Sequence, residues 1–207
     1  QRTYLEEVAS ASGGLALTSS SVERPVLTGI QTNLYMVFMD TTWRHCDTKG
    51  IVGLIHPESH FVDPKGGDLR RRTYGRLRRH WQFFNLMALF PDAGVTGAMS
   101  FGVSVYGQPG VPSFLNIAAL VAPSTADESL SHDGRGPDPA LMFPGGGWDL
   151  RPHRSRLVEL DLEVLADWAE LFDEPGTPAA EARLLRPGTT ADLEALSVLA
   201  QQPKRLA

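Results

Sequence analysis

The 207-residue sequence has one cysteine, Cys46, and no apolar run as long as the ~18 residues of a membrane-spanning helix. A single cysteine excludes an internal disulfide and is typical of a reducing compartment. The N-terminal segment QRTYLEEVAS lacks the basic-then-apolar pattern of a signal peptide. We therefore expect a cytoplasmic protein with no membrane partner, in which Cys46 acts as a small buried hydrophobe.

The familiar glycine-rich nucleotide loops are also missing. No Lys-Ser or Lys-Thr follows Gly145-Gly146-Gly147, as a phosphate-binding loop requires. Gly94, Gly97 and Gly102 lack the spacing of a dinucleotide fingerprint. Beyond the presence of the residue types, nothing indicates a Ser-His-Asp triad. The sequence therefore excludes the commonest cofactor signatures and predicts no catalytic residue directly.

Charge is unevenly distributed behind the net value of −5. Six arginines lie between Arg70 and Arg79, and seven acidic residues lie between Glu159 and Glu174. Concentrated arginines favour phosphate and hence nucleic acid. Alternatively they form a solvated face, with some arginines paired to the acidic helix. The charge pattern leaves both interpretations open.

Hydrophobic periodicity predicts helices over residues 1–12, 32–46, 68–81, 157–172 and 189–201, with a loop over 13–25. The apolar run after Gly50, bounded by Pro57, predicts a strand buried on both faces in a parallel sheet. Residues 100–106 and 113–121 predict an antiparallel hairpin around a Gly-Pro turn. Glycine and proline are dense in 123–153. We therefore expect an α/β domain over 1–122, a linker over 123–153 and a helical appendage over 154–207.

The segment His56-Pro57-Glu58-Ser59-His60 follows the first predicted strand. Its histidines are four residues apart, but a zinc protease motif places Glu directly after the first His on a helix. Pro57 makes helical geometry across the pair unfavourable. We therefore expect a polar turn instead of a metal site. In open α/β sheets, ligands bind beyond the carboxyl ends of strands, so this turn is expected at an active-site rim.

Leu89-Phe90-Pro91 stands between the arginine-rich helix and the predicted hairpin. Enzymes that modify a base in DNA flip it out and stack it on aromatic side chains. Phe90 is accordingly a candidate for the wall of a base pocket. The alternative is that Phe90 is an ordinary core residue.

Taken in order, these segments resemble the C-terminal half of the catalytic domain of gamma-class adenine-N6 DNA methyltransferases of restriction–modification and phage defence. The matching pieces are Asn33-Leu34-Tyr35, the strand and turn from Gly50 to Phe61 with His60 as one extra residue, Leu69-Arg70, Phe90-Pro91, and the strand Ser100 to Tyr106. The resemblance implies the second half of a Rossmann-like sheet, with a parallel strand followed by an antiparallel terminal hairpin. It requires the strand at 50–57 to lie in a parallel sheet.

The resemblance also implies roles for individual residues. Phe90 and Phe101 would stack on the target base. Arg70, Arg71, Arg72 and Arg76 would contact DNA phosphates. The rim of the active site would be formed by Asn33, Tyr35, His56, Pro57, Glu58 and Ser59.

The donor implied is S-adenosylmethionine, but the sequence has neither its glycine-rich loop nor the Asn-Pro-Pro-Tyr motif that binds the target amine. We expect both before residue 1 of a longer protein or on a partner chain, so that this chain alone is inactive. The principal alternative is a non-catalytic DNA-binding or scaffold module that uses the Arg70–Arg79 helix. A different transferase built on the same half-fold is a third possibility.

Overall fold

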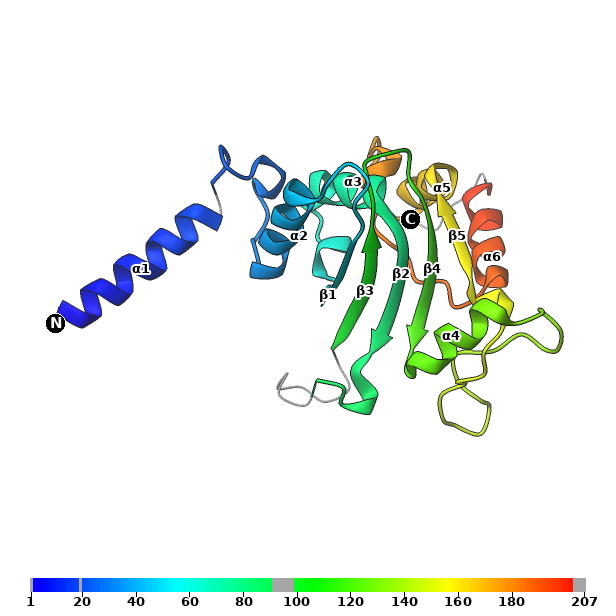
Figure 1. The fold of residues 1–207 in the computed structure, drawn as a ribbon. Helices are drawn as coiled ribbons and strands as arrows, with labels where there is room; N and C mark the ends of the chain where they lie inside the picture. Colours follow the sequence, from blue (N-terminus) through cyan, green and yellow to red (C-terminus); the bar gives the residue numbers. More distant parts are fainter. Residues whose placement is uncertain (1, 19, 91–98, 203–207) are drawn as a thin grey trace.

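A five-stranded mixed sheet forms the centre of the computed structural model, which describes residues 2–18, 20–90 and 99–202 (Figure 1). The strands lie in the order β1-β3-β2-β4-β5, where β1 is Val52–Pro57, β2 is Leu77–Phe84, β3 is Ser100–Tyr106, β4 is Ser113–Leu120 and β5 is Val158–Asp161. Within the described residues, β2 and β4 form the one parallel pair, and all other neighbours are antiparallel. The chain is thus an α/β protein with a mixed sheet and C-terminal helices.

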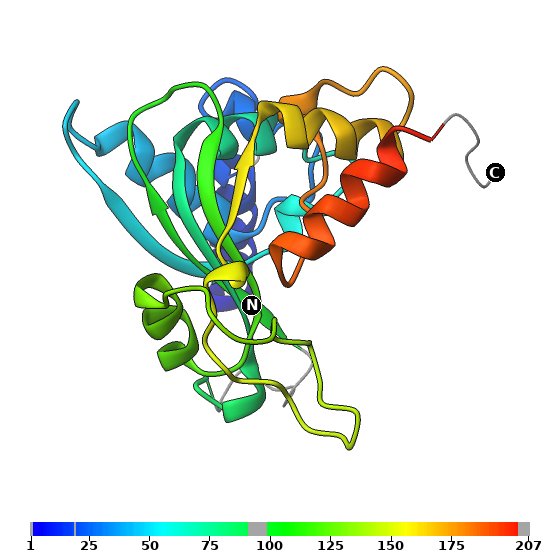
Figure 2. The ribbon, with the colours of Figure 1, turned by 90° about the vertical axis from the view of Figure 1, so that its right-hand side faces the viewer.

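Helices cover the two faces of the sheet unequally. On one face pack α2 (Leu34–His45), α3 (Gly67–Arg76), α5 (Leu162–Phe172) and α6 (Thr190–Ala200), while α4 (Pro123–Ser131) lies on the other (Figure 2). Helix α1 (Arg2–Thr18) projects away from the sheet (Figure 1). Short 3-10 turns occur at Pro25–Leu27, Ser59–Phe61, Asn85–Met87, Arg154–Arg156 and Ala179–Glu181.

The alternation of side chains along each strand divides the core into two clusters. Tyr106 and Phe114 point to the four-helix face, where they join residues such as Leu69 and Trp168. Phe83 and Ile117 point to the opposite face and pack with Ala126 of α4 and its neighbours. The larger cluster therefore lies under α2, α3 and α5.

Side-chain caps define where three of these helices begin. Asn33 Oδ1 accepts from the backbone N–H of Tyr35 at the start of α2. Asp161 accepts from two backbone N–H groups at the start of α5. Thr189 and Asp192 form a reciprocal capping box at α6, which confirms the helix predicted from this pair.

The predicted helix over 68–81 is correct only as far as Arg76. At Leu77 the backbone becomes extended, and residues 77–84 form β2. Tertiary pairing overrides the helix propensity of the arginines, because β2 is hydrogen-bonded to β3 on one side and β4 on the other. Arg78 and Arg79 therefore lie on a strand.

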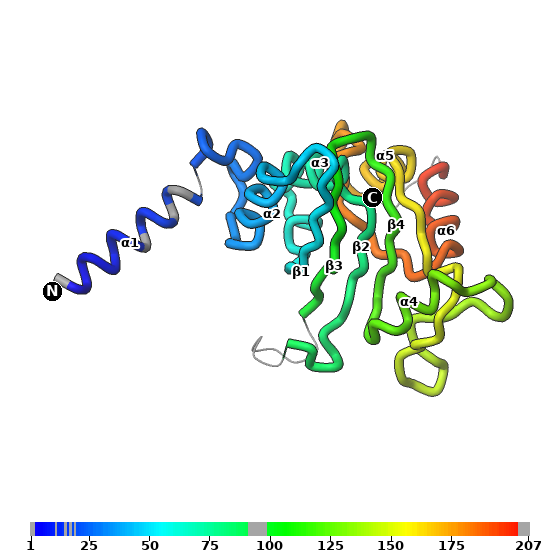
Figure 3. The backbone as a smooth tube through the Cα atoms, in the orientation of Figure 1, coloured from blue at the N-terminus to red at the C-terminus, as the bar shows by residue number. Residues whose placement is uncertain are grey.

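The predicted hairpin between 100–106 and 113–121 is wrong. β2 lies between β3 and β4 in the sheet (Figure 3). The antiparallel hairpin that contains β3 is therefore formed with β2. Sequence proximity favoured the short Gly-Pro connection, but β4 instead runs parallel to β2. Phe90 consequently lies in the connection between the two strands of the β2–β3 hairpin.

The prediction that the strand after Gly50 is buried on both faces of a parallel sheet is also wrong. In the part of the chain that the structure describes, β1 is an edge strand whose single neighbour is antiparallel β3. Ile51 and Ile55 are 74% and 59% exposed. A short apolar run does not distinguish a central strand from an edge strand, and here one face of β1 is largely uncovered.

Three smaller boundaries also differ from the predictions. Helix α1 continues to Thr18, through residues predicted as a loop. The expected linker begins with helix α4, where Pro123 occupies the first turn. Residues 158–161 form β5 ahead of α5, instead of the first turn of that helix. Among the described residues, no helix is both long and apolar enough to cross a bilayer.

Candidate functional site

A small recess lies at the ends of β1 and β3, beside the β2–β3 connection. Its volume is about 190 Å³, and it is lined by Ile55, His56, Pro57, Asn85, Phe90, Met99, Ser100 and Phe101. It thus brings together both predicted stacking residues and two of the predicted rim residues. The volume is below the ~300–1,000 Å³ of pockets for drug-sized ligands, and suits a single planar ring system.

Phe90 forms one side of this recess and presents its ring to solvent. Its side chain is 44% exposed, so Phe90 is not the fully buried core residue of the alternative interpretation. Its ring meets Phe101 edge to face, with centroids 5.0 Å apart and planes at 88°. Phe101 in turn stacks on Phe83 at 5.3 Å. Phe90 is therefore supported from behind while one part of its ring remains accessible.

Asn85 holds the backbone of Phe90 at two points. Asn85 Nδ2 donates to Phe90 O, and Phe90 N donates to Asn85 Oδ1, both at 3.2 Å. Asn85 is itself buried, and its backbone N–H donates to Met99 O at 3.0 Å. Between them, Ala88 adopts a left-handed conformation with φ of 50°. Sequence reasoning missed Asn85, because no local pattern marks a side chain that binds backbone five residues later.

A buried carboxylate–imidazole pair lies behind the recess. Glu58 Oε1 is 2.8 Å from His80 Nε2, with both side chains no more than 1% exposed, although the two atoms are not aligned as a hydrogen bond. Burial raises the pKa of Glu58 to about 7, against the opposing attraction of Arg186. Burial lowers the pKa of His80 to about 3. Both shifts favour the neutral forms. Near neutral pH His80 is therefore uncharged, and Glu58 is protonated in part of the molecules.

His56 belongs to the same interior group. Its Nδ1 is 2.7 Å from Pro57 O, which can only accept, so Nδ1 carries the proton. Nε2 therefore accepts from the Tyr106 hydroxyl at 2.7 Å. Burial lowers the pKa of His56 and raises that of Tyr106, which keeps both groups neutral.

Tyr35 links helix α2 to the turn after β1. Its hydroxyl lies 2.8 Å from Ser59 Oγ and accepts from the backbone N–H of His60 at 3.0 Å. Its ring stacks on His56 at 5.4 Å. Tyr35, His56, Glu58 and Ser59, all predicted at the rim, thus surround one turn. Asn33 is different, because its side chain caps α2.

Unpartnered polar atoms are concentrated under the four-helix face of the sheet. Within the described residues, they include His60 Nε2, His80 Nδ1, Gln82 Nε2 and Asn116 Nδ2, whereas Glu58 Oε1 and His80 Nε2 contact each other at 2.8 Å without hydrogen-bond alignment. A buried polar group without a partner costs about 1–3 kcal/mol, so such a concentration marks a functional region more readily than a stabilising one. No cluster of three possible metal ligands is found in the described parts of the chain.

Glycine at position 102 leaves room for the buried pair. A Cβ at Gly102 would lie 3.1 Å from His80 Nε2 and 3.4 Å from Glu58 Oε1. Any larger residue would therefore press on His80 and come into van der Waals contact with Glu58.

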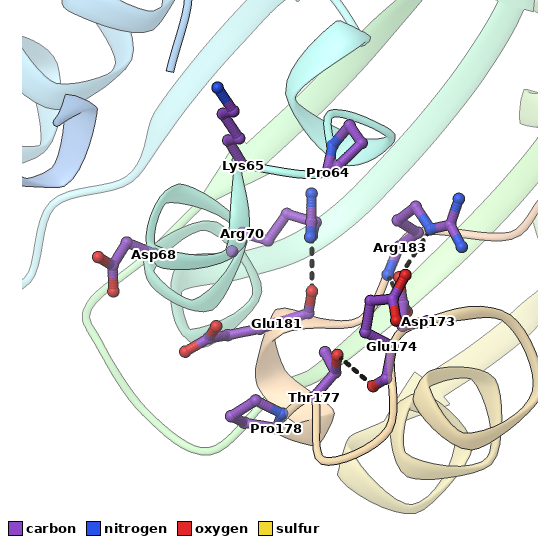
Figure 4. A pocket seen from close by; sticks show the side chains of 11 residues that line it. Pro64, Lys65, Asp68, Arg70, Asp173, Glu174, Thr177, Pro178, Glu181 and Arg183 are labelled. Atoms are coloured by element: carbon purple, nitrogen blue, oxygen red, sulfur yellow. Dashed lines mark hydrogen bonds and ion pairs between the residues drawn. The ribbon is translucent and has the colours of Figure 1, made fainter. Parts of the chain in front are cut away.

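The four arginines expected to contact phosphate do not share one surface. Arg70 is only 2% exposed, with Nε donating to Glu181 O at 2.7 Å and Nη1 to the carbonyls of His60 and Asp63 (Figure 4). Its burial conflicts with the predicted phosphate contact, and Arg70 instead ties α3 to the turn after β1. The remaining three differ among themselves: Arg71 pairs with Asp68 and Glu181, Arg72 is exposed, and Arg76 lies over the Trp43 ring.

A second pocket, of about 380 Å³, borders Arg70 and the start of α3 (Figure 4). Its lining holds three basic and four acidic side chains, and Arg183 pairs with Asp173 at 2.6 Å. The Glu181 carboxylate lies close to Gly67, near the positive end of the helix dipole of α3. This pocket therefore offers little unbalanced charge to a ligand. The ion pairs described for Arg71 are made with Asp68 and Glu181, outside the acidic stretch 159–174 considered from sequence.

No protein-family model matches the chain, and no curated protein matches its sequence. Function must therefore be inferred from the residues themselves. The recess offers an aromatic surface held in place by Asn85, next to neutral hydrogen-bonding groups. This chemistry suits a flat, uncharged ring such as a nucleobase.

Proposed function

We propose that this chain is part of a DNA adenine-N6 methyltransferase, and that its recess forms one wall of the pocket for a flipped adenine. The observation that carries the proposal is the half-exposed Phe90, fixed by Asn85 against Phe101 beside His56 and Pro57. A flipped base loses its stacking partners in DNA, and an exposed aromatic ring replaces part of that lost interaction. Residues of three of the matched segments, His56 and Pro57, Phe90, and Phe101, meet in this one place.

Strand directions agree with the resemblance only in part. β1 and β2 are both antiparallel to β3, which lies between them, so β1 and β2 run in the same direction. β2 and β3 form an antiparallel hairpin with Phe90 in its connection, whereas the resemblance implies a hairpin of the strands at 100–106 and 113–121. The direct neighbour of β1 is nevertheless antiparallel. The proposal therefore requires a parallel strand from the rest of the enzyme along the free edge of β1.

The described residues do not fit S-adenosylmethionine. After β4, a strand of the one described parallel pair, the chain enters α4 through Ala122 and Pro123, without a glycine turn or a side-chain cap. The sequence contains no Asn-Pro-Pro-aromatic or Asp-Pro-Pro-aromatic motif. We therefore assign the cofactor and the amine-binding loop to another part of the enzyme, and no chemical step to this chain alone.

Binding of a fluorescent base analogue tests the role of Phe90. A single-stranded oligonucleotide with one 2-aminopurine should bind the chain, with quenching as the base stacks. Phe90→Ala should weaken binding by about 5- to 150-fold, because stacking of one base on an aromatic is worth about 1–3 kcal/mol. Phe172→Ala is the matched control, since Phe172 is also 44% exposed but lies on α5. Equal affinity of the two variants would falsify the proposed base-binding role.

The alternative of a non-catalytic DNA-binding module loses one of its main residues. Arg70 is buried among carbonyl groups, and Arg71 is already paired with two carboxylates. The exposed Arg72 and Arg79 remain available on α3 and β2, whereas the Arg78 guanidinium donates to the carbonyls of Leu77 and Gln108. If Phe90→Ala leaves oligonucleotide binding intact while Arg72→Glu abolishes it, this second function is the correct one.

A further inference from the structure

A separate cavity lies at the carboxyl ends of the parallel strands β2 and β4, which point the same way in Figure 1. Its volume is about 490 Å³, within the usual range of small-molecule sites. Ligands in open α/β sheets bind beyond the carboxyl ends of parallel strands. The lining residues are Gln82, Phe84, Ala119, Pro139, Ala140, Leu141, Arg156, Arg186, Gly188, Thr189 and Asp192.

An irregularity between the two strands shapes this end of the sheet. The register shifts between Trp81 and Phe83, and Ala119 adopts a left-handed conformation with φ of 57°. Gln82 Oε1 accepts from the freed backbone N–H of Ala119 at 2.7 Å. Gln82 Nε2 is buried, and the described residues give it no partner. Gln82, a lining residue of the cavity, thus carries a buried donor without a hydrogen-bond partner.

Two guanidinium groups line the same cavity. Arg156 is 3% exposed, and Nε and Nη2 donate to the carbonyls of Arg151 and Asp149. The Asp149 carboxylate is already engaged by Arg151 at 2.6 Å. Arg186 is more accessible, and its Nη2 is 3.3 Å from Glu58 Oε2. Buried cations are normally paired with an anion. Arg156 donates to carbonyl groups instead, so its positive charge is incompletely compensated.

One carboxylate, Asp192, also lines the cavity, but its Oδ2 already accepts from the backbone N–H groups of Gly188 and Thr189. Two guanidinium groups therefore face one occupied carboxylate. The same lining includes an apolar wall formed by Phe84, Pro139, Ala140 and Leu141.

We propose that this cavity binds a small organic anion, with its phosphate or carboxylate group at Arg186 and Arg156 and an apolar body against Phe84 and Leu141. The proposal goes beyond the adenine-binding recess and stands without it. Guanidinium groups bind both phosphate and carboxylate through two parallel hydrogen bonds. These hydrogen bonds make the site specific for an anionic head group. The apolar wall selects the body of the ligand.

Calorimetric titration with three probes tests this site. Phenyl phosphate and benzoate share an apolar ring but differ in head group, whereas inorganic phosphate lacks the ring. At least one ring-bearing probe should bind, and should bind at least about tenfold more tightly than inorganic phosphate, because burying a ring supplies the larger hydrophobic contribution. The tighter of the two identifies the head group. No binding of either ring-bearing probe, or equal affinity for inorganic phosphate, would overturn the proposal.

Matched arginine variants localise the binding. Arg186→Gln should weaken the best probe by about tenfold or more, as expected for loss of a hydrogen bond to a charged group. Arg183→Gln should change affinity less than about twofold; Arg183 is similarly exposed and similarly paired, at 38% against 36%, but borders a different pocket. Equal losses in the two variants would contradict the assignment.

A variant that blocks the entrance of the cavity tests the location of the ligand without changing Arg186. Ala140 is exposed on the rim, so Ala140→Trp should fill the entrance without disturbing the core. Its far-ultraviolet circular dichroism should match that of the unaltered protein while binding of the best probe falls by more than about tenfold. Retained binding in the folded Ala140→Trp variant would place the ligand elsewhere.

Discussion

Replacing Glu58 by glutamine should stabilise the protein increasingly as pH rises. Glu58 is 3% exposed, and burial raises its pKa from 4.5 to about 7. Because the folded pKa is the higher one, the stability contributed by its proton is complete below pH 4.5 and is lost as pH rises through 7. At about 1.4 kcal/mol for each pH unit, the loss reaches up to about 3 kcal/mol. Glutamine resembles the protonated carboxyl and avoids this loss.

In the unaltered protein, the titration of His80 offsets the loss of stability caused by the titration of Glu58. Its folded pKa is lowered from 6.5 to about 3, so its contribution is complete above pH 6.5 and is lost as pH falls toward 3. Between pH 4.5 and 6.5 the two titrations oppose each other, and the stability curve should be nearly flat. Glu58→Gln removes one of them. The variant should then gain stability by up to about 2–3 kcal/mol across this interval.

Urea unfolding, followed by tryptophan fluorescence from pH 4.5 to pH 8, measures this difference. Glu159→Gln, at an exposed position on β5, is the control and should shift stability by less than about 0.5 kcal/mol. If Glu58→Gln is instead destabilised by the same amount at every pH, then Glu58 is folded as a charged partner of Arg186. That result would refute the neutral-pair reasoning.

Three further substitutions have defined outcomes. Asn85→Ala should lower the free energy of urea unfolding by about 1–2 kcal/mol and should weaken 2-aminopurine binding as Phe90→Ala does. Unchanged base binding would show that Asn85 does not position Phe90. Gly102→Ala should cost about 1–3 kcal/mol in the same unfolding assay, because its Cβ would press on His80, and wild-type stability would mean the pair is loosely packed. Arg70→Met should lower the thermal midpoint strongly, with a loss of about 3 kcal/mol or more, since it leaves buried carbonyls without a donor; a loss below about 1 kcal/mol would contradict its structural role.

Local sequence signals predicted several elements correctly because those elements depend on neighbouring residues. The α6 capping box needs only Thr189 and Asp192, three residues apart. The central strand β2 has no such local signal. Its arginine-rich start favours a helix, and only pairing with both β3 and β4 makes residues 77–84 extended. The same limit applies to β1, whose edge position depends on the order of the whole sheet.

The candidate site was partly predictable for the same reason. The turn from His56 to Ser59 follows a strand, and Phe90 stands beside a proline, so both could be selected from short patterns. His80 and Arg186 could not, because each contacts Glu58 only through the tertiary fold. Arg186 is 128 residues away from its partner in sequence. Whether Phe90 binds a base remains a prediction that the oligonucleotide experiment decides.

The contact between Arg186 and Glu58 joins the proposed anion cavity to the buried acid, and so makes anion binding and protonation of Glu58 thermodynamically linked. Arg186 lines the cavity, and its charge opposes the burial that raises the pKa of Glu58. An anion that neutralises Arg186 weakens this attraction and raises the pKa of Glu58 further. Binding would therefore take up a fraction of a proton near neutral pH, and by reciprocity acidification would tighten binding. Calorimetric titration in buffers of different ionisation enthalpy would measure the proton taken up on binding. This uptake would report anion binding in the cavity through the change in protonation of Glu58.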